Sequence, residues 1–376
     1  MPTYHVDTLP NGIKSLTIEG SVQKSDDELF RTLSSLSKNT QDLFLNLSAM
    51  EDSEQEFFDY LSEISPRLRL RVITKYPAVM EKCSKLGLQV FPSEKSAQLA
   101  MTGDNTVKAV LSRLREVPIL NTDAYKLMTY IGNPNANMDE LEKMIKENPG
   151  LVSQILKMAN SAMYYRGTKI ESLSPAMATL GANNLRMLFL FNFYHGVTNI
   201  FGAQKEVIDH GKQCALLSEF IAKSAKAPRE EHPKVWLSGL LHDIGQQALA
   251  FVFPEKYQLV RKYVEEEKKP SYFGELLTFG IDHQAVGRQL AIKWNFPEYL
   301  VNVIGDHHSL KAIGWNRLTL PVFCANNYLN ERVGLPFVSY YSKLVGYFML
   351  YKAEVTWAES PGEEFEKALE GEHPLF

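Results

Sequence analysis

Cysteine is scarce in this chain of 376 residues, which contains only three. Cys83, Cys214 and Cys324 lack the close paired spacing of a cysteine-based zinc site, and three scattered thiols do not build a disulfide framework. The scarcity suits a reducing compartment, and we therefore expect the protein to reside in the cytoplasm.

Long apolar runs are also absent. The richest one, at residues 187–191, is far too short to span a bilayer and predicts a buried helix segment. The N-terminal residues 1–7 have neither the basic nor the apolar segment of a secretion signal. We therefore expect no membrane partner.

Neither sign of charge is in clear excess. Lysine and arginine number 40 against 44 acidic residues, for a net charge of −4. A net charge this close to zero lacks the basic excess that is typical of nucleic-acid-binding proteins, so we expect no nucleic-acid partner. The hydrophobic content of 45% is enough for real cores, and the length predicts two or three domains. The sequence shows no repeat of fixed period.

The first hundred residues alternate between strand and helix patterns. Apolar residues recur at helical spacing, as at Leu29, Leu33 and Leu36, or alternate as in a strand. Such alternation predicts a mostly parallel or mixed sheet covered by helices. The predicted strands are 13–19, 42–47, 68–74 and 90–91, and the predicted helices are 26–37, 54–64, 78–86 and 93–101.

After residue 105 the pattern changes to helices separated by proline and glycine. No strand pattern interrupts this region, so we expect an all-helical fold there. The predicted helices are 107–116, 122–132, 138–148, 151–160, 174–180, 183–196, 206–225, 233–252, 256–268, 272–280, 282–294, 298–309, 315–332, 339–352 and 361–370.

A histidine and an aspartate stand side by side at His242 and Asp243, within an apolar stretch. Two ligand-type side chains with no residue between them can hold one metal ion from neighbouring helical positions. A lone histidine, in contrast, is more often a satisfied structural residue. That structural role is expected for His5, His232, His373 and His195, the last as a helix cap.

Several short phrases of the helical region occur in a recognisable order. They are Val-Pro-Ile-Leu at 117–120, Asn-Pro-Gly-Leu at 148–151, Leu-Lys-Met-Ala-Asn-Ser-Ala-Met-Tyr at 156–164, Ile-Glu-Ser-Leu at 170–173, Ala-Met-Ala-Thr-Leu-Gly at 176–181 and Ser-Gly-Leu-Leu-His-Asp-Ile-Gly at 238–245. Through these phrases the region resembles an HDOD domain, a branch of the HD phosphohydrolase superfamily found in bacterial signalling proteins. The resemblance covers about residues 107–330.

The resemblance implies a metal site. HD enzymes hold one or two divalent metals through histidines and aspartates in a fixed order, and such ligands suit Fe, Mn or Zn. A bridging carboxylate can place two metals close enough to activate a water for attack on phosphorus. The implied ligands are His210, His242, Asp243, His283, His307 and His308.

Two positions depart from the pattern of active members. Asn326 stands where a late aspartate is expected, and Asn is neutral and a poor ligand for such metals. Gln246 replaces the lysine that typically follows the dyad glycine. Changes of this kind cost about 10–100-fold in affinity or activity. Catalytic residues therefore stay unassigned; an active form would use His242 and Asp243.

The N-terminal segment resembles a STAS domain, the fold of anti-sigma-factor antagonists. The likeness rests on Leu-Phe-Leu-Asn-Leu-Ser at 43–48 and on Asp52 and Ser53 before a helix. Asn46 replaces an aspartate of that family, and the second serine and the glycine of its phosphorylation motif are missing. We therefore expect Ser53 to cap the following helix rather than to be phosphorylated.

The sequence thus predicts an α+β multidomain protein. A STAS-like α/β domain spans 1–102, an all-α HDOD domain spans 107–330, and a helical extension at 331–376 packs on the HDOD domain. The predicted function is non-catalytic signal transduction in a bacterial cytoplasm, through a signalling protein partner or a nucleotide-like ligand. The alternative is a metal-dependent phosphohydrolase or phosphodiesterase with one or two Fe, Mn or Zn ions. A third interpretation is a pure scaffold.

Overall fold

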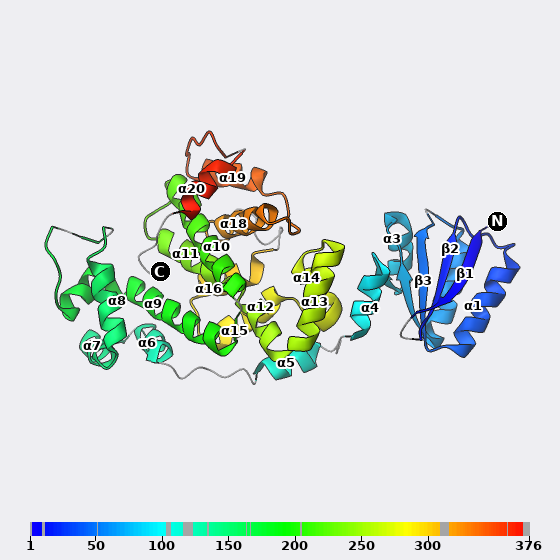
Figure 1. The fold of residues 1–376 in the computed structure, drawn as a ribbon, viewed down its shortest axis with the longest axis horizontal. Helices are drawn as coiled ribbons and strands as arrows, with labels where there is room; N and C mark the ends of the chain where they lie inside the picture. The colour runs from blue at the N-terminus through cyan, green and yellow to red at the C-terminus, as the bar shows by residue number, and fades with distance from the viewer. Residues whose placement is uncertain are drawn as a thin grey trace. The chain divides into compact units, whose positions relative to one another are not determined.

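The structure, a computed structural model, forms two compact units (Figure 1). One unit comprises Met1–Asn105 with Leu259–Glu267, and the other comprises Thr106–Gln258 and Lys268–Phe376. The structure describes residues 2–9, 12–50, 52–102, 107–115, 123–133, 135–162, 164–165, 167–203, 205–308, 316–358 and 360–370. The phrase at 117–120 and His373 lie outside these ranges.

The N-terminal unit is built on a five-stranded sheet in the order β1-β2-β3-β4-β5. Strand β1 runs antiparallel to β2, and the remaining neighbours are parallel. The strands are β1 (Thr3–Thr8), β2 (Lys14–Glu19), β3 (Asp42–Ala49), β4 (Arg69–Ile73) and β5 (Gln89–Phe91). The predicted α+β class, with an α/β sheet before a helical region, is therefore confirmed.

Helices cover the sheet because alternate strand residues are apolar. Leu16, Leu45 and Val72 point to one face and form a core with helices α1 (Asp27–Asn39), α2 (Gln55–Ile64) and α3 (Pro77–Lys85). Helix α4 (Glu94–Thr102) packs on β3, β4 and β5. A 3₁₀ turn, Ser65–Arg67, precedes β4. Strand β1 was not predicted, because all its residues except Tyr4 are exposed and only Tyr4 and Val6 alternate along it.

Ser53 does not cap helix α2, contrary to the sequence prediction. Its hydroxyl is 9% exposed, accepts a hydrogen bond from the Val22 amide at 2.8 Å and donates one to the Val22 carbonyl at 2.7 Å. The helix begins at Gln55, with Glu54 as its N-cap. The serine is therefore a clamp between the segment after β2 and the start of α2.

Replacing Ser53 with alanine should lower the free energy of unfolding by about 1–3 kcal/mol, since it removes the hydroxyl that accepts from the buried Val22 amide. Urea unfolding measures this effect, with the exposed Ser84→Ala as the control. Equal stability of the two variants would show that the clamp contributes nothing.

The second unit consists of helices (Figure 1). A buried cluster joins α10, α18, α19 and α20, so that the residues after Arg332 pack on α10 and α18. No helix within the described ranges is long and apolar enough to cross a bilayer. The helices are α5 (Val107–Arg115), α6 (Asp123–Ile131), α7 (Met138–Lys146), α8 (Pro149–Ala159), α9 (Leu173–Ile200), α10 (Lys205–Ser224), α11 (His232–Leu241), α12 (Ile244–Val252), α13 (Pro254–Glu267), α14 (Ser271–Phe279), α15 (His283–Lys293), α16 (Glu298–Asp306), α18 (Thr319–Arg332), α19 (Tyr341–Leu350) and α20 (Gly362–Leu369). Of α13, the residues from Leu259 on belong to the first unit.

Helix α9 departs from the sequence prediction at its C-terminal end. The predicted break near residue 181 is present, because Gly181 takes the left-handed φ of 73°. The helix then continues to Ile200, so His195 lies inside it and the assignment of His195 as a cap is wrong. The His195 and Phe191 rings form a T-shaped pair with their centroids 4.5 Å apart, so His195 packs against the aromatic side chain of its own helix.

The predicted helix 233–252 is in fact two helices. Helix α11 ends at Leu241 and α12 begins at Ile244, with His242 and Asp243 forming the junction. The φ and ψ of Asp243 are −96° and 17°, outside the helical range. The sequence did not reveal the break because no proline stands there and apolar residues continue at Leu240, Leu241 and Ile244 on both sides of the dyad. The break turns the two side chains toward the interior of the unit.

Candidate metal centre

Five of the six predicted ligands lie at the ends of helices α11, α12, α15 and α16, and the sixth, His210, lies inside α10. Residues at a helix end are free of the helical repeat, which lets several of them face one point. His210 lies in the first turns of α10, His283 opens α15, and His307 and His308 directly follow α16. His283 is held in register by Asp282, whose side chain accepts a hydrogen bond from the Ala285 amide at 2.9 Å.

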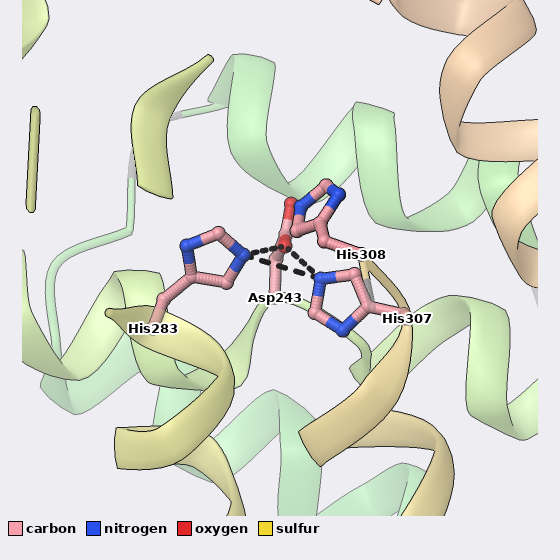
Figure 2. A group of neighbouring side chains, drawn as sticks. All are labelled: Asp243, His283, His307 and His308. Carbon is pink, nitrogen blue, oxygen red and sulfur yellow. Dashed lines mark hydrogen bonds and ion pairs between the residues drawn. The ribbon is translucent and has the colours of Figure 1, made fainter. Parts of the chain in front are cut away.

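One group of ligand atoms forms a nearly regular triangle (Figure 2). Asp243 Oδ1 lies 3.4 Å from His283 Nε2 and 3.4 Å from His307 Nε2, and the two nitrogens are 3.2 Å apart. A ligand atom of His308 lies within 4.8 Å of these atoms. We call Asp243, His283 and His307 the first triangle.

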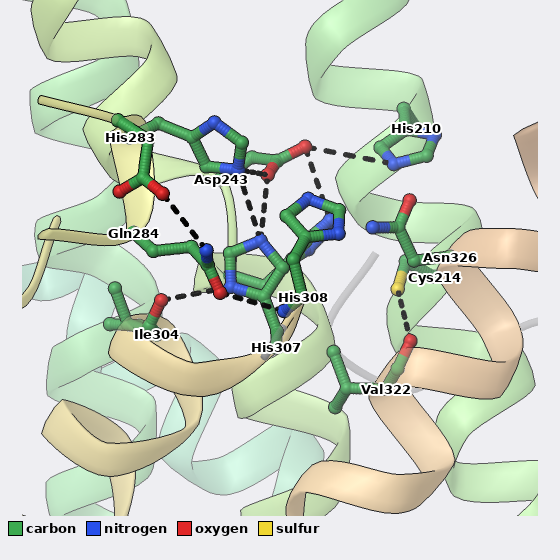
Figure 3. A network of polar contacts seen from close by, with 12 residues as sticks. His210, Cys214, Asp243, His283, Gln284, Ile304, His307, His308, Val322 and Asn326 are labelled. Atoms are coloured by element: carbon green, nitrogen blue, oxygen red, sulfur yellow. Dashed lines mark hydrogen bonds and ion pairs between the residues drawn. The ribbon is translucent and has the colours of Figure 1, made fainter. Parts of the chain in front are cut away.

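A second group shares the same carboxylate (Figure 3). The other oxygen, Asp243 Oδ2, lies 3.1 Å from His242 Nε2 and 3.8 Å from His210 Nε2. We call Asp243, His210 and His242 the second triangle. The two oxygens of Asp243 thus face different pairs of histidines, as a carboxylate that bridges two metal positions would.

Hydrogen bonds fix which nitrogen of each ring faces the cluster. The Nδ1 atom of His242 donates to the Gly239 carbonyl at 2.7 Å, and that of His307 donates to the Ile304 carbonyl at 2.8 Å. A carbonyl only accepts, so Nδ1 carries the proton in both rings. The Nε2 lone pairs are therefore left facing Asp243, which is the orientation that metal-ligating histidines adopt.

This arrangement fits a divalent metal ion. Nitrogen and oxygen atoms bound about 2.0–2.2 Å from one ion lie about 3–3.5 Å apart, as the atoms of the first triangle do. His242 Nε2 and Asp243 Oδ1 are buried without hydrogen-bond partners. Two imidazole nitrogens and a carboxylate oxygen that face one another need a positive charge between them, from a proton or a metal ion.

Burial and neighbouring charges set the protonation of these groups. Burial would raise the pKa of Asp243, but His242 and the other histidines hold it well below the usual range. Burial beside His242 lowers the pKa of His210 to about 4. Burial also lowers the pKa of His283, yet the Glu275 carboxylate outweighs it and raises that pKa to about 9. A metal in the first triangle would therefore replace a proton.

Asn326 lies at the edge of the second triangle (Figure 3). Its side chain is buried, at 3% exposure, and lies near enough to His210 to oppose the lowering of the pKa of that ring. It also accepts a hydrogen bond from Asn330 at 3.4 Å. The neutral amide thus occupies the place beside His210 where the resemblance leads one to expect a carboxylate.

Sequence reasoning missed two polar residues beside the cluster. Glu275 in α14 is completely buried and hydrogen-bonds with the Nδ1 atom of His283 at 2.7 Å. Gln284 accepts a hydrogen bond from the His308 amide at 2.7 Å. The only available signal was a lone acidic residue in an otherwise apolar helix, which by itself marks no site.

His5, His232 and Asn160 make contacts that hold the local fold together. His5 is exposed and pairs with Asp7 at 3.2 Å, and His232 contacts the Ala227 carbonyl at 2.9 Å. The Asn160 side chain bonds both backbone groups of Ile170 at 2.8 Å, and so closes the loop before α9. None of these contacts involves the metal-ligand cluster.

A close helix contact sets the spacing between Asp243 and His283. Gly245 of α12 packs directly on α15, and a Cβ atom there would lie 2.0 Å from the His283 carbonyl oxygen and 2.6 Å from the Gly287 nitrogen. Only glycine permits this approach. The contact brings the start of α15 against the dyad junction.

Comparison with known proteins gives one family match and one curated relative. The HDOD domain model matches residues 117–310, which is more than half of the chain. An uncharacterized protein of Treponema pallidum (strain Nichols) is 22% identical over 236 residues. That alignment covers 62% of this chain and 45% of the relative, so the chain spans less than half of the relative's length.

Solved structures show a similar fold. A protein of Marinobacter aquaeolei VT8, provisionally named for signal transduction, gives a TM-score of 0.53 at 15% identity and covers 98% of this chain and 91% of its own. An HDOD domain protein of unknown function from Geobacter sulfurreducens gives a TM-score of 0.51 at 22% identity, and the match covers 72% of this chain and 99% of that protein. A provisionally named phosphohydrolase of Shewanella amazonensis SB2B gives a TM-score of 0.50 at 20% identity, and the match covers 72% of this chain and 96% of that protein. At these identities the likeness concerns the fold alone.

Proposed function

The chain belongs to the HDOD domain family, and we propose that it is a signal-transduction protein whose helical unit is a metal-bound recognition module. The observation that carries the proposal is the unequal ligand supply around Asp243. The first triangle has His308 as a further ligand-type neighbour, whereas the neutral Asn326 stands beside the second triangle where a carboxylate is expected. One metal ion of the Fe, Mn or Zn type suits the first triangle, and a second ion is weakly held.

A single bound metal ion favours recognition over hydrolysis. Two-metal hydrolases use both ions to activate the attacking water and to stabilise the leaving oxygen. An ion in the first triangle would attract an anionic oxygen, such as a phosphate oxygen of a nucleotide-like ligand. Gln246 is neutral where active HD enzymes have a lysine, and so it supplies no positive charge for such a ligand.

The N-terminal unit, on this proposal, is a STAS-like domain that exchanges a signal with a protein partner. Support comes from its order of strands and helices, with an antiparallel β1 followed by four parallel strands. A bacterial cytoplasm is part of the same proposal.

A metal-dependent phosphohydrolase or phosphodiesterase is the second candidate. The observation in its favour is the two-sided carboxylate of Asp243, with one oxygen facing each pair of histidines. Such a bridging ligand is what two-metal activation of water requires. His242 and Asp243 would then be the catalytic pair.

Metal content and turnover separate the two candidates. We expect purified protein to bind close to one equivalent of Fe, Mn or Zn, and to hydrolyse phosphodiesters no faster than the His242→Ala and Asp243→Ala variants. Elemental analysis and a phosphodiester assay measure these quantities. Turnover that both variants lose would establish the hydrolase instead. Metal-free protein that still binds its partner would favour a scaffold.

A further inference from the structure

We propose that Glu275 is a positioning residue of the metal centre, acting through His283 and not through contact with the metal ion. The inference rests on the proposed metal site. Glu275 is completely buried in α14. A buried carboxylate is unfavourable unless its oxygens are hydrogen-bonded, so its partners indicate its role.

Both oxygens of Glu275 have partners. Oε2 accepts a hydrogen bond from the His283 backbone amide at 2.8 Å and another from His283 Nδ1 at 2.7 Å. Oε1 accepts one from the Tyr257 hydroxyl at 2.7 Å. A single oxygen therefore holds both the backbone and the ring of His283, which sets the position and the rotation of its imidazole.

The opposite nitrogen of the same ring belongs to the first triangle. With Nδ1 donating to Glu275, His283 Nε2 is directed to within 3.4 Å of Asp243 Oδ1 and 3.2 Å of His307 Nε2. A rotation or flip of the ring would remove this ligand atom from the triangle. The bond to Glu275 opposes such a change.

The charge of Glu275 distinguishes His283 from the other ligands. The Nδ1 atoms of His242 and His307 donate to neutral backbone carbonyls, whereas His283 donates to a carboxylate. A carboxylate on the far nitrogen makes an imidazole more basic and a stronger ligand. With Asn326 in the place of a carboxylate ligand, Glu275 supplies negative charge to the cluster through His283.

Residues behind Glu275 hold it in turn. Tyr257 is 1% exposed, and the Gln246 side chain hydrogen-bonds with it. A chain of contacts therefore runs from the half-buried Gln246 in α12 through the buried Tyr257 and Glu275 to His283. Gln246, which departs from the pattern of active HD enzymes, is part of the support for a metal ligand.

The Glu275→Gln variant tests the proposal in the full-length chain. Its amide oxygen can accept both His283 bonds and its amide nitrogen can donate to Tyr257, so the shape is kept and the charge is lost. We expect zinc affinity, measured by competition with a chelator, to fall about 10–100-fold. The thermal midpoint of the metal-free protein should fall as well, because the variant also removes the charged partner of protonated His283. Zinc affinity of the folded variant is therefore the measurement that reports on the positioning role.

The matched control is Glu219→Gln, which also removes a buried carboxylate, at 4% exposure, but one that pairs with Lys223 at 2.9 Å. Its zinc affinity should equal that of the wild type. Wild-type affinity in Glu275→Gln would overturn the positioning role and leave the metal site standing. A wild-type protein that binds no zinc would overturn the metal site as well.

A measurement on the unaltered protein covers the case in which Glu275→Gln does not fold. In the zinc-loaded wild type, ¹⁵N NMR of the histidine rings should show His283 with its proton on Nδ1 and its Nε2 bound to metal. A metal-bound Nδ1, or a proton on Nε2, would overturn the inference.

Discussion

Replacing Asp243 with alanine should abolish metal binding by the protein. Both triangles use this carboxylate, Oδ1 with His283 and His307 and Oδ2 with His210 and His242. Loss of a residue that only supports a ligand costs about 10–100-fold in affinity, so the loss of the shared ligand itself should exceed about 100-fold. Isothermal titration with Zn²⁺ or Mn²⁺ measures the change.

Two further variants make the result specific. Asp243→Asn keeps the shape and loses the charge, so it should also bind weakly while retaining the fold seen by circular dichroism. Asp139→Asn removes an exposed carboxylate from α7 and should bind metal as the wild type does. If Asp243→Ala binds metal with unchanged affinity, the cluster is not the binding site.

Gly245→Ala should damage stability and metal binding together. The added Cβ atom would overlap backbone atoms of α15, at 2.0 Å from the His283 carbonyl oxygen, where no flexible side chain can yield. Overpacking of this kind costs about 1–3 kcal/mol, and a backbone clash should reach the upper end. Because α15 must move away from α12, His283 leaves the first triangle and zinc affinity should fall.

The control for this variant is Gly362→Ala in α20, where a Cβ atom would meet nothing within 4 Å. Its stability should change by no more than about 0.5 kcal/mol. Thermal unfolding of the metal-free proteins and zinc titration measure both effects. A Gly245→Ala variant as stable as Gly362→Ala would show that the two helices can separate without cost.

Local pattern was enough for most of the fold, and the exceptions share a cause. Strand β2 and helix α1 bury alternate or helically spaced apolar residues, which the sequence displays. Strand β1 buries almost nothing, and so left no pattern. The break at the dyad, between α11 and α12, was hidden because Leu241 and Ile244 directly flank the dyad and no proline marks the junction.

The sequence predicted some parts of the site and not others. His242 and Asp243 are adjacent in the chain, and the resemblance supplied the other ligands by order along it. Glu275 contacts His283 across the turn that joins α14 to α15, a pairing that no local pattern encodes. The direction of each ring nitrogen depends on hydrogen bonds to carbonyls such as Gly239, and so on the folded backbone. The order of residues along the chain was enough to name the ligands. Their distances and the direction of each ring nitrogen could be known only from the folded structure.

The most direct test of the metal centre is an anomalous difference map from crystals of the full-length protein loaded with Zn²⁺. We predict one strong peak about 2.0–2.2 Å from Asp243 Oδ1, His283 Nε2 and His307 Nε2. The peak between His210 and His242 should be much weaker, because Asn326 is neutral. Zinc bound elsewhere, with no peak in the first triangle, would contradict this account.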